Sequence, residues 1–391
     1  MKPRSLGIGW QIGVPSGWGV YGVNLALELA RSGIVPELFF ATPQVALTPE
    51  QAGVLEPHLV RQRENLARFR GGGGALEMPL LHALGDKLDL PPFLKNLRGS
   101  PDIGLAFIES AVIPTRNLED AKRFAVIVAG STWNAELLRR HGIGEVRTCL
   151  QGVDLSLFSP GPRAGRFAGR FAIFSGGKLE YRKGQDLVVA AFKRFHGRHP
   201  DALLVAAWHN PWPEAARGLS MSTHLAHAPR VDGSGRLDVA GWLVANGLPE
   251  SAFVDLGALN NAETPEILRE VDVGLFPNRC EGGTNLVAME AMACGVPAIL
   301  SRNTGHLDLM SGDNCFALDL QIPIGAMTNR PDLDGWGESS IEQIVSRLED
   351  AYTSRERRLA IGAAGAQFMT AWGWPAQVQR LVTAVSEFTA A

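Results

Sequence analysis

The residues best equipped for chemistry gather in one segment, Glu281 to Glu290, which reads Glu-Gly-Gly-Thr-Asn-Leu-Val-Ala-Met-Glu. In this segment a loop of small residues opens a helix rich in Ala and Met. Thr284 or Asn285 is a plausible N-cap, so free backbone N–H groups and the positive helix end point out of the loop and can bind an anion. The two carboxylates can accept hydrogen bonds from hydroxyl groups. A sugar nucleotide matches this pattern, because it carries phosphates as well as ribose and sugar hydroxyls.

A second group of charges suits the same kind of ligand. Lys178 and Lys183 follow the apolar run Phe171 to Ser175 on a glycine-containing turn, where two cations could meet a diphosphate. Departure of a phosphate leaves negative charge behind, so fixed cations stabilise the transition state more than the ground state. Taken alone, two lysines on a loop are more often solvated side chains without a ligand.

The elements that must position these residues are short apolar runs of the buried-strand type, separated by segments with a helical pattern. The runs span residues 6–10, 35–41, 103–108, 124–129, 171–175, 202–208, 252–256, 272–276 and 296–300. Strands that alternate with helices predict parallel sheets covered on both faces. Residues 70–100, which contain three prolines, are expected to be irregular and mobile.

The length of the chain predicts two domains, because 391 residues exceed what one hydrophobic core usually holds. Residues 151–170 have little periodicity and contain two prolines, and we place the boundary within them. The predicted fold class is therefore α/β, with two doubly wound Rossmann-like domains facing across a cleft. Ligands of such sheets bind beyond the carboxyl ends of the strands.

Composition narrows the range of partners. The net charge of -3 argues against nucleic acid as a partner. Four cysteines have neither close pairs nor zinc-ligand spacing, so we expect reduced thiols in a cytoplasmic protein. Met-Lys-Pro-Arg has no long apolar stretch after it, so no signal peptide is expected. No apolar run approaches the ~20 residues that span a bilayer, so no transmembrane segment is expected, while a peripheral membrane association stays open because the acceptor could be a lipid.

A glycine motif, Gly17-Trp-Gly19-Val-Tyr-Gly22, follows the first strand and fits the G-x-G-x-x-G pattern of dinucleotide-binding proteins. Two features weigh against NAD. Six residues separate the strand from Gly17, where that pattern expects a tight turn. The second strand ends in Phe39-Phe-Ala-Thr42, without the acidic residue that would bind the ribose. An NAD-dependent enzyme is therefore the least favoured alternative.

Three segments, in order, resemble the nucleotide-sugar glycosyltransferases of the GT-B fold, and most closely the retaining group called family 4. The first runs from Val126 to Pro160 and ends in Gly-Val-Asp…Phe-x-Pro, which resembles the interdomain passage of that family. The second, Phe174 to Leu187, resembles its donor-phosphate loop, and the third is the segment from Glu281 to Leu300.

The resemblance implies a retaining enzyme that moves a sugar from a nucleotide diphosphate sugar, of the UDP or GDP type, to an acceptor hydroxyl without a metal or other cofactor. The acceptor would be a small molecule, a glycan or a lipid-linked molecule. Residues 1–160 would bind the acceptor, residues 161–365 the donor, and residues 366–391 would form a helix that returns to the N-terminal domain.

The same resemblance implies roles for particular residues. The implied catalytic residues are Glu281, Lys183, Lys178 and Glu109. The implied donor-binding residues are Gly17, Gly19, Lys178, Lys183, Gly282, Gly283, Thr284, Asn285 and Glu290, with Glu290 on the ribose hydroxyls and Glu281 facing the donor sugar.

The chain departs from the family pattern at three points. Eight residues separate Glu281 from Glu290, where seven are usual, and Lys178 stands where Arg is common. Many members also carry a histidine at the end of a strand that follows an Asp. The corresponding stretch here, Asp102 to Ser110, has none, and Glu109 is the candidate for that position. A solvated loop carboxylate is an equally good interpretation of Glu109.

Two other functions stay open. One is an epimerase or hydrolase on this fold, which would turn over the donor without an acceptor. The other is a non-catalytic sugar-nucleotide-binding partner of another transferase. Asp332-Leu-Asp334 resembles a D-x-D metal motif but lies far along the chain from the phosphate segments, so no metal site is predicted. His209 and His306 could each line the cleft, although a lone histidine is more often a structural hydrogen-bonder. His306 is the better candidate for a ligand contact, because the stretch Asn303 to His306 begins right after a strand end.

Overall fold

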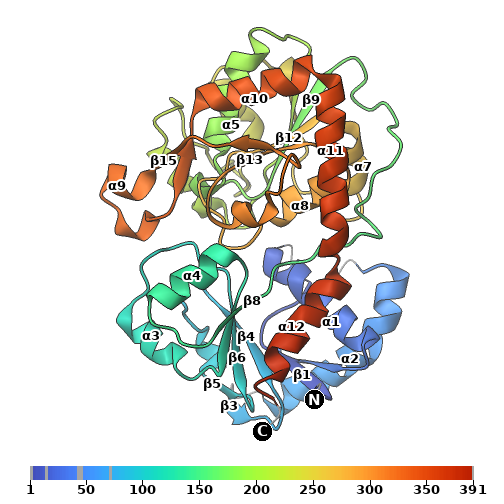
Figure 1. The fold of residues 1–391 in the computed structure, drawn as a ribbon, viewed down its shortest axis with the longest axis vertical. Helices are drawn as coiled ribbons and strands as arrows, with labels where there is room; N and C mark the ends of the chain where they lie inside the picture. Colours follow the sequence, from blue (N-terminus) through green and yellow to red (C-terminus); the bar gives the residue numbers. More distant parts are fainter. Residues whose placement is uncertain (1–2, 14–15, 42–46, 70–72, 390–391) are drawn as a thin grey trace. The chain divides into compact units, whose positions relative to one another are not determined.

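The computed structural model describes residues 3–13, 16–41, 47–69 and 73–389. The chain forms two compact units, each built around one six-stranded sheet (Figure 1). Unit 1 consists of Met1–Gly152, Gly282–Thr284 and Trp372–Ala391, and unit 2 of Val153–Glu281 and Asn285–Ala371.

The sheet of unit 1 is parallel, with the strand order β2-β1-β4-β6-β7-β8. Its strands are β1 (Ser5–Ile8), β2 (Val35–Leu38), β4 (Leu80–Leu84), β6 (Asp102–Ala106), β7 (Val126–Ala129) and β8 (Val146–Thr148). A separate parallel pair joins β3 (Gly73–Ala75) to β5 (Asn96–Arg98). The helices are α1 (Gly17–Arg31), α2 (Pro49–Arg68), α3 (Thr115–Ala121), α4 (Thr132–Arg140) and α12 (Trp374–Ser386), with a short 3₁₀ turn η1 (Pro92–Leu94).

The sheet of unit 2 is also parallel, with the order β11-β10-β9-β12-β13-β14. Its strands are β9 (Phe171–Gly176), β10 (Ala202–Ala207), β11 (Phe253–Asp255), β12 (Val273–Phe276), β13 (Ala298–Ser301) and β14 (Phe316–Leu318). A hairpin pairs β15 (Gln321–Pro323) with β16 (Gly337–Ser339). The helices are α5 (Gln185–His196), α6 (Val239–Ala245), α7 (Thr264–Glu270), α8 (Leu286–Ala293), α9 (Ile324–Thr328), α10 (Ile341–Thr353) and α11 (Arg355–Met369). The 3₁₀ turns are η2 (Tyr181–Lys183), η3 (Pro213–Met221), η4 (Glu250–Ala252), η5 (Thr304–Leu309) and η6 (Pro331–Leu333), and η7 (Thr370–Trp372) precedes α12.

The prediction of two α/β domains with parallel sheets is confirmed. Every apolar run named above overlaps a strand, because a strand covered by helices on both faces is apolar throughout. In β7, β12 and β13, for example, every residue is buried. Parallel strands in this arrangement place their carboxyl ends at one edge of the sheet, where the loops of each unit begin.

The expected irregular structure of residues 70–100 was wrong where the structure describes that segment. It contains β4, which lies between β1 and β6 in the sheet of unit 1. The prolines flank this strand rather than interrupt it, and the carbonyl group of Pro79 accepts a hydrogen bond from Gly7 at 2.8 Å. His82 interrupts the apolar run of β4, but its side chain is buried against Asp102, with Nε2 2.7 Å from Oδ1.

Helix α1 begins at Gly17, the first residue of the glycine motif. Ser16 is its N-cap, and the Ser16 hydroxyl accepts a hydrogen bond from the Gly19 N–H at 3.3 Å. Gly17 and Gly19 therefore belong to the first turn of α1 rather than to a loop before it. A serine N-cap outweighs the low helix propensity of two glycines in a first turn.

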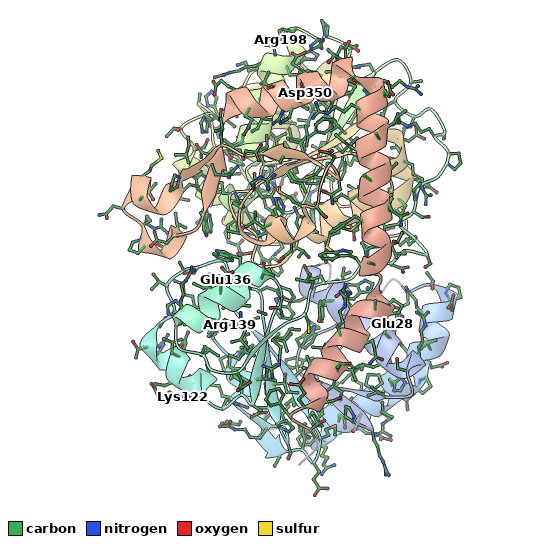
Figure 2. The ribbon with its side chains drawn as sticks, in the orientation of Figure 1. Glu28, Lys122, Glu136, Arg139, Arg198 and Asp350 are labelled. Atoms are coloured by element: carbon green, nitrogen blue, oxygen red, sulfur yellow. The ribbon has the colours of Figure 1, made fainter. Side chains whose placement is uncertain are left out.

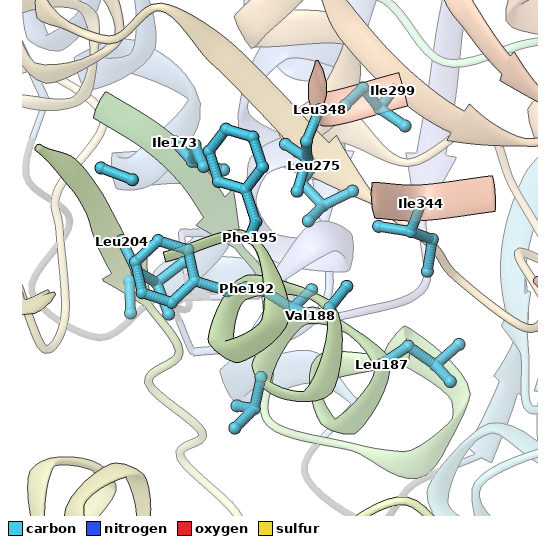
Figure 3. Packing of buried hydrophobic residues seen from close by; sticks show 14 of the residues in the cluster. Ile173, Leu187, Val188, Phe192, Phe195, Leu204, Leu275, Ile299, Ile344 and Leu348 are labelled. Atoms are coloured by element: carbon cyan, nitrogen blue, oxygen red, sulfur yellow. The ribbon is translucent and has the colours of Figure 1, made fainter. Parts of the chain in front are cut away.

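The core of unit 2 forms where α5 and α10 pack on the sheet (Figure 3). Along α5 the buried apolar residues recur at helical spacing: Leu187, Val188, Ala191, Phe192 and Phe195. This stripe meets side chains of β9, β10 and β12. Burial of each large apolar side chain contributes about 1.5–3 kcal/mol, so the packing holds fixed the strand ends from which the loops of unit 2 start.

The C-terminal segment from Trp372 onward belongs to unit 1. The ring of Trp374 lies edge-on to Tyr21 of α1, with the ring centroids 5.2 Å apart. Over the part of the chain that the structure describes, none of the helices combines the length and the apolar character required to cross a membrane.

Candidate functional site

The candidate donor site in unit 2 lies where three neighbouring strands end. Lys178 and η2 follow β9, Glu281 follows β12, and Asn303 follows β13. Because β9, β12 and β13 are adjacent and parallel, their carboxyl ends meet at one edge of the sheet. The topology thus brings together side chains that are about 100 residues apart in the sequence.

Glu281 is buried, and donors from two loops surround its carboxylate. Lys183 Nζ lies 2.5 Å from one carboxylate oxygen, and Arg182 Nη1 lies 3.0 Å from the other. Asn278 Nδ2 also donates to Glu281. Burial alone would raise the pKa of Glu281, but the charges of Lys183 and Arg182 outweigh burial and lower that pKa to about 2. At neutral pH Glu281 is therefore a charged carboxylate that holds Lys183 in place.

The backbone of Glu281 is fixed by the loop after β13. Its N–H donates to Thr304 Oγ1 at 2.8 Å, and the Thr304 hydroxyl donates to Asn303 Oδ1 at 3.0 Å. Thr304 has a φ of 41°, which is a strained conformation for a β-branched residue. Strained residues gather at sites whose geometry the surroundings impose, so Thr304 supports the assignment of this region as functional.

Lys178 is more exposed than Lys183. Its ammonium lies 4.0 Å from Glu180 and 4.7 Å from the ring centroid of Trp212, and its side chain is 35% exposed. Its carbonyl group accepts a hydrogen bond from the buried side chain of Gln185 at 2.7 Å. The backbone of this turn is therefore held while the Lys178 side chain reaches toward solvent.

The turn η2, which carries Arg182 and Lys183, is called the cationic turn below. Gly184 joins this turn to α5, and its position requires glycine. Its φ is 71°, in the left-handed region that glycine adopts at no steric cost. A Cβ atom there would lie 2.3 Å from the carbonyl oxygen of Pro277, at the end of β12. The turn that carries Lys183 and the loop that carries Glu281 are thus in direct backbone contact.

Helix α8 starts at this edge without a side-chain cap. Asn285 is its N-cap residue, with a φ of 63°, and no side chain in the described part of the chain caps the helix. Asn285 Nδ2 instead lies 3.0 Å from His306 Nε2. Burial lowers the pKa of His306 to about 4, so the ring is neutral at pH 7 and its Nε2 accepts this hydrogen bond. The first-turn N–H groups of α8 remain oriented to bind an anion.

Glu290 lies one turn inside α8 and is 8% exposed. No residue of the described ranges forms a hydrogen bond or an ion pair with its carboxylate. Burial raises the pKa of Glu290 to about 8. A buried carboxylate without a cation to compensate it is costly, and functional sites are where such groups are commonly retained.

The remaining predicted site residues belong to unit 1. Gly17 and Gly19 lie in the first turn of α1, and Glu109 follows the carboxyl end of β6. The Glu109 N–H donates to Asp86 Oδ1 at 2.5 Å. The loop residues Gly282, Gly283 and Thr284 are grouped with unit 1, where the carbonyl group of Gly282 accepts a hydrogen bond from Ser131 Oγ at 2.8 Å.

Sequence reasoning missed three residues that contact Glu281. Arg182 and Asn278 donate to its carboxylate, and the Thr304 hydroxyl accepts from its N–H. The adjacent basic pair Arg182-Lys183 was a signal for the first of them. The other two could not be inferred from spacing, since their contacts depend on how two separate loops fold back.

Within the described ranges, no group of three or more His, Cys, Asp or Glu side chains is arranged to hold a metal ion. Asp332 of the D-x-D triplet is paired with Arg330, whose Nη2 lies 2.5 Å from Oδ2. The carboxylate of Asp332 therefore forms a local ion pair within the D-x-D segment.

This chain is similar in sequence to a known protein family and to several curated proteins. Residues 163–314 match the family model described as glycosyl transferases group 1. Among curated proteins, the chain is 25% identical over 249 residues to the GDP-mannose-dependent alpha-(1-6)-phosphatidylinositol monomannoside mannosyltransferase of Mycolicibacterium smegmatis. That match covers 60% of this chain and 54% of the relative, so the chain spans about half the length of the curated relatives it matches. It is also 29% identical over 227 residues to a D-inositol 3-phosphate glycosyltransferase of Catenulispora acidiphila, covering 53% of this chain and 49% of that one.

Solved structures resemble this chain over its whole length. Sucrose-phosphate synthase from Thermosynechococcus elongatus has a TM-score of 0.67 at 15% identity and covers 99% of both chains. HepE from Anabaena, solved in complex with UDP and glucose, has a TM-score of 0.65 at 14% identity and covers 98% of this chain and 100% of its own. At such identities the likeness concerns the fold.

Proposed function

Because this chain belongs to the GT-B glycosyltransferases of group 1, we propose that it moves a sugar from a nucleotide diphosphate sugar to an acceptor hydroxyl. The observation that carries this proposal is the cationic turn of unit 2. Lys183 and Arg182 converge at the strand ends beside the uncapped start of α8. Cations and helix-end N–H groups together bind the phosphates of a diphosphate.

In the proposed reaction, the bond between the anomeric carbon and the diphosphate oxygen breaks as the acceptor oxygen bonds to the same face of the sugar. The leaving phosphate takes the acceptor proton, so the sugar keeps its configuration. Lys183, Lys178 and the first-turn N–H groups of α8 stabilise the charge that grows on the diphosphate. Glu290 binds the ribose hydroxyls, and this role is supported by its buried carboxylate, which has no hydrogen-bond or ion-pair partner among the described residues.

The donor is of the UDP or GDP type. A relative carries GDP-mannose in its name, and a structural neighbour was solved with UDP and glucose. The acceptor is a small molecule, a glycan or a lipid-linked molecule, and the reaction takes place in the cytoplasm without a metal ion. The net charge of -3 supports the expectation that nucleic acid is not a partner.

A thermal-shift panel tests the donor site. UDP, GDP, ADP, their sugar conjugates and NAD are added in turn to purified protein. A nucleotide diphosphate at ~100-fold its dissociation constant is expected to stabilise the folded protein by ~2.7 kcal/mol. A shift confined to one nucleotide diphosphate family identifies the base. A thermal shift with NAD alone, or no shift with any of these ligands, contradicts the proposed donor site.

The stereochemical outcome tests the mechanism. Proton NMR of the product is expected to show the anomeric configuration of the donor sugar, and saturating EDTA is expected to leave the rate unchanged. A product of opposite configuration rules out retention, and a rate abolished by EDTA and restored by a metal ion rules out metal independence. Donor consumed equally fast without acceptor would instead identify a hydrolase or epimerase.

A further inference from the structure

Arg279 stands two residues before Glu281 and is completely buried. Its guanidinium pairs with Asp186 at two points, with both Nη–Oδ distances at 2.7 Å. Its Nε donates to Glu338 Oε2 at 2.8 Å. The ring of Tyr181 stacks on the guanidinium, with Cζ 3.9 Å from the ring centroid. A planar fork with partners on every side has one orientation.

Arg279 also fastens the turn that carries Lys183. Its Nη1 donates to the carbonyl group of Tyr181 at 2.7 Å, and its backbone N–H donates to the carbonyl group of Arg182 at 2.7 Å. Both carbonyl groups belong to η2, which ends at Lys183. Asp186 lies three residues later, in the first turn of α5. Arg279 therefore ties the loop after β12 to the chain on both sides of Lys183.

The network continues into the β15–β16 hairpin. Glu338 of β16 accepts from Arg279 and also lies 2.9 Å from His224 Nε2. Apolar side chains of the same hairpin region, Ile324, Leu333 and Trp336, pack around Tyr181. Hydrogen bonds from Arg279 thus hold the turn η2 in place, and side chains from residues 324–336 pack against its Tyr181.

Stability alone gives no reason to bury these charges. Replacing a buried ion pair by well-packed apolar residues is often neutral or stabilising, because desolvation of the charges offsets their attraction. The two-point pair between Arg279 and Asp186 instead fixes a geometry. It holds in place the turn that ends in Lys183.

We propose that Arg279, anchored by Asp186, is a positioning residue that holds the η2 turn so that Lys183 points at the leaving diphosphate. This inference rests on the proposed function. Arg279 acts through Lys183 and touches no substrate itself. A positive charge at position 279 is therefore insufficient, since lysine lacks the planar fork that pairs with Asp186 and reaches the Tyr181 carbonyl group.

A double-mutant cycle tests this role. Arg279→Lys is expected to lower kcat about 10- to 100-fold, as for other residues that orient a reacting group, while the donor KM changes less than about twofold. In a Lys183→Ala background the same substitution is expected to change kcat less than about twofold, because the group that it positions is gone. A residue needed only for stability would lower kcat by the same factor in both backgrounds, and that result overturns the proposal.

Further variants keep the test decisive. Asp186→Asn removes the anchor and is expected to repeat the pattern, and Glu338→Gln repeats it more weakly. Either replaces Arg279→Lys in the cycle if that variant lacks the circular dichroism of the folded protein. Arg198→Lys is the matched control, because Arg198 is exposed in the same unit (Figure 2) and pairs with Glu349 at 2.6 Å. Its kcat is expected to equal that of the wild type.

Nucleotide binding distinguishes a failure of the proposed function from a failure of the positioning role of Arg279. If the wild-type protein shows no thermal shift with any nucleotide diphosphate, the proposed function fails, and the role of Arg279 fails with it. If the shift is present and Arg279→Lys retains wild-type kcat, only the positioning role is overturned.

Discussion

Replacing Lys183 by Ala is expected to lower kcat about 100- to 1000-fold, the range seen when one donor to a developing charge is removed. Lys183 is more buried than Lys178, with its side chain 12% exposed, and its ammonium lies 2.5 Å from Glu281. The charge on the diphosphate grows as the sugar departs, so the loss falls mainly on kcat. Binding of the free nucleotide diphosphate is expected to weaken less than about tenfold. Steady-state rates and a thermal-shift titration measure the two effects separately.

Two lysines provide the comparison. Lys178→Ala is expected to cost about tenfold in kcat, because a cation that is 35% exposed acts in a more aqueous environment. Lys193 lies on α5 in the same unit and donates to the carbonyl group of Asn246, so Lys193→Ala is expected to leave kcat unchanged. If Lys183→Ala also keeps wild-type kcat and KM, Lys183 takes no part in the reaction.

Glu290→Gln is expected to weaken nucleotide binding about 3- to 10-fold at pH 7, because a hydrogen bond between neutral groups contributes roughly 0.5–1.5 kcal/mol. The same substitution is expected to stabilise the folded protein at pH 8. Glu290 is 8% exposed, and burial raises its pKa to about 8 from a usual value of 4.5. Glutamine has no charge to bury, so a loss of binding accompanies a gain in stability.

The sign of the pH dependence follows from the raised pKa. Between pH 4.5 and 8 the unfolded chain carries an ionised Glu290 and the folded chain a protonated one. The folded state therefore binds more protons, and the free energy of unfolding of the wild type falls by up to about 1.4 kcal/mol per pH unit from this group. The contribution is fully present below pH 4.5 and is lost as the pH rises through about 8. The advantage of Glu290→Gln should grow over this range, to on the order of 4–5 kcal/mol at pH 8.

Denaturant unfolding at several pH values measures this difference. Glu270→Gln is the control, because Glu270 is equally buried but accepts hydrogen bonds from three backbone N–H groups. That variant is expected to be less stable than the wild type at neutral pH and to bind nucleotide normally. Parallel unfolding curves for wild type and Glu290→Gln from pH 5 to 8 would show that Glu290 ionises normally, and its assigned role would lose its support.

The fold class followed from the sequence because strands covered on both faces are continuous apolar runs. Strand β4 was not predicted because His82 interrupts its apolar run. The buried His82 side chain is stabilised by a hydrogen bond with Asp102, 20 residues further along the chain. Local sequence patterns do not indicate a hydrogen-bond partner so far away in the sequence. The start of α1 likewise depends on one residue outside the glycine motif, since the Ser16 cap precedes the two glycines of the first turn.

The candidate site was predictable where it depends on topology. Lys183 and Glu281 each follow a strand, and adjacent parallel strands bring such residues together. It was not predictable where it depends on side-chain direction. Nothing in Pro-Asn-Arg-Cys-Glu indicates that Asn278 turns toward Glu281 while Arg279 turns toward Asp186. Nor does spacing reveal that Glu281 pairs with Arg182 and Lys183 while Glu290 has no such partner in the part of the chain that the structure describes.

Thr304 has a consequence for any attempt to evolve this protein in the laboratory. A β-branched residue at a φ of 41° costs on the order of 1–3 kcal/mol, which glycine at the same position would largely recover. Glycine would also remove the hydroxyl that accepts a hydrogen bond from the buried Glu281 N–H, which costs about 1–3 kcal/mol. Because the two effects offset one another, selection for heat resistance alone should tolerate Thr304→Gly, whereas a library screened for sugar transfer should keep the threonine that fixes the Glu281 backbone.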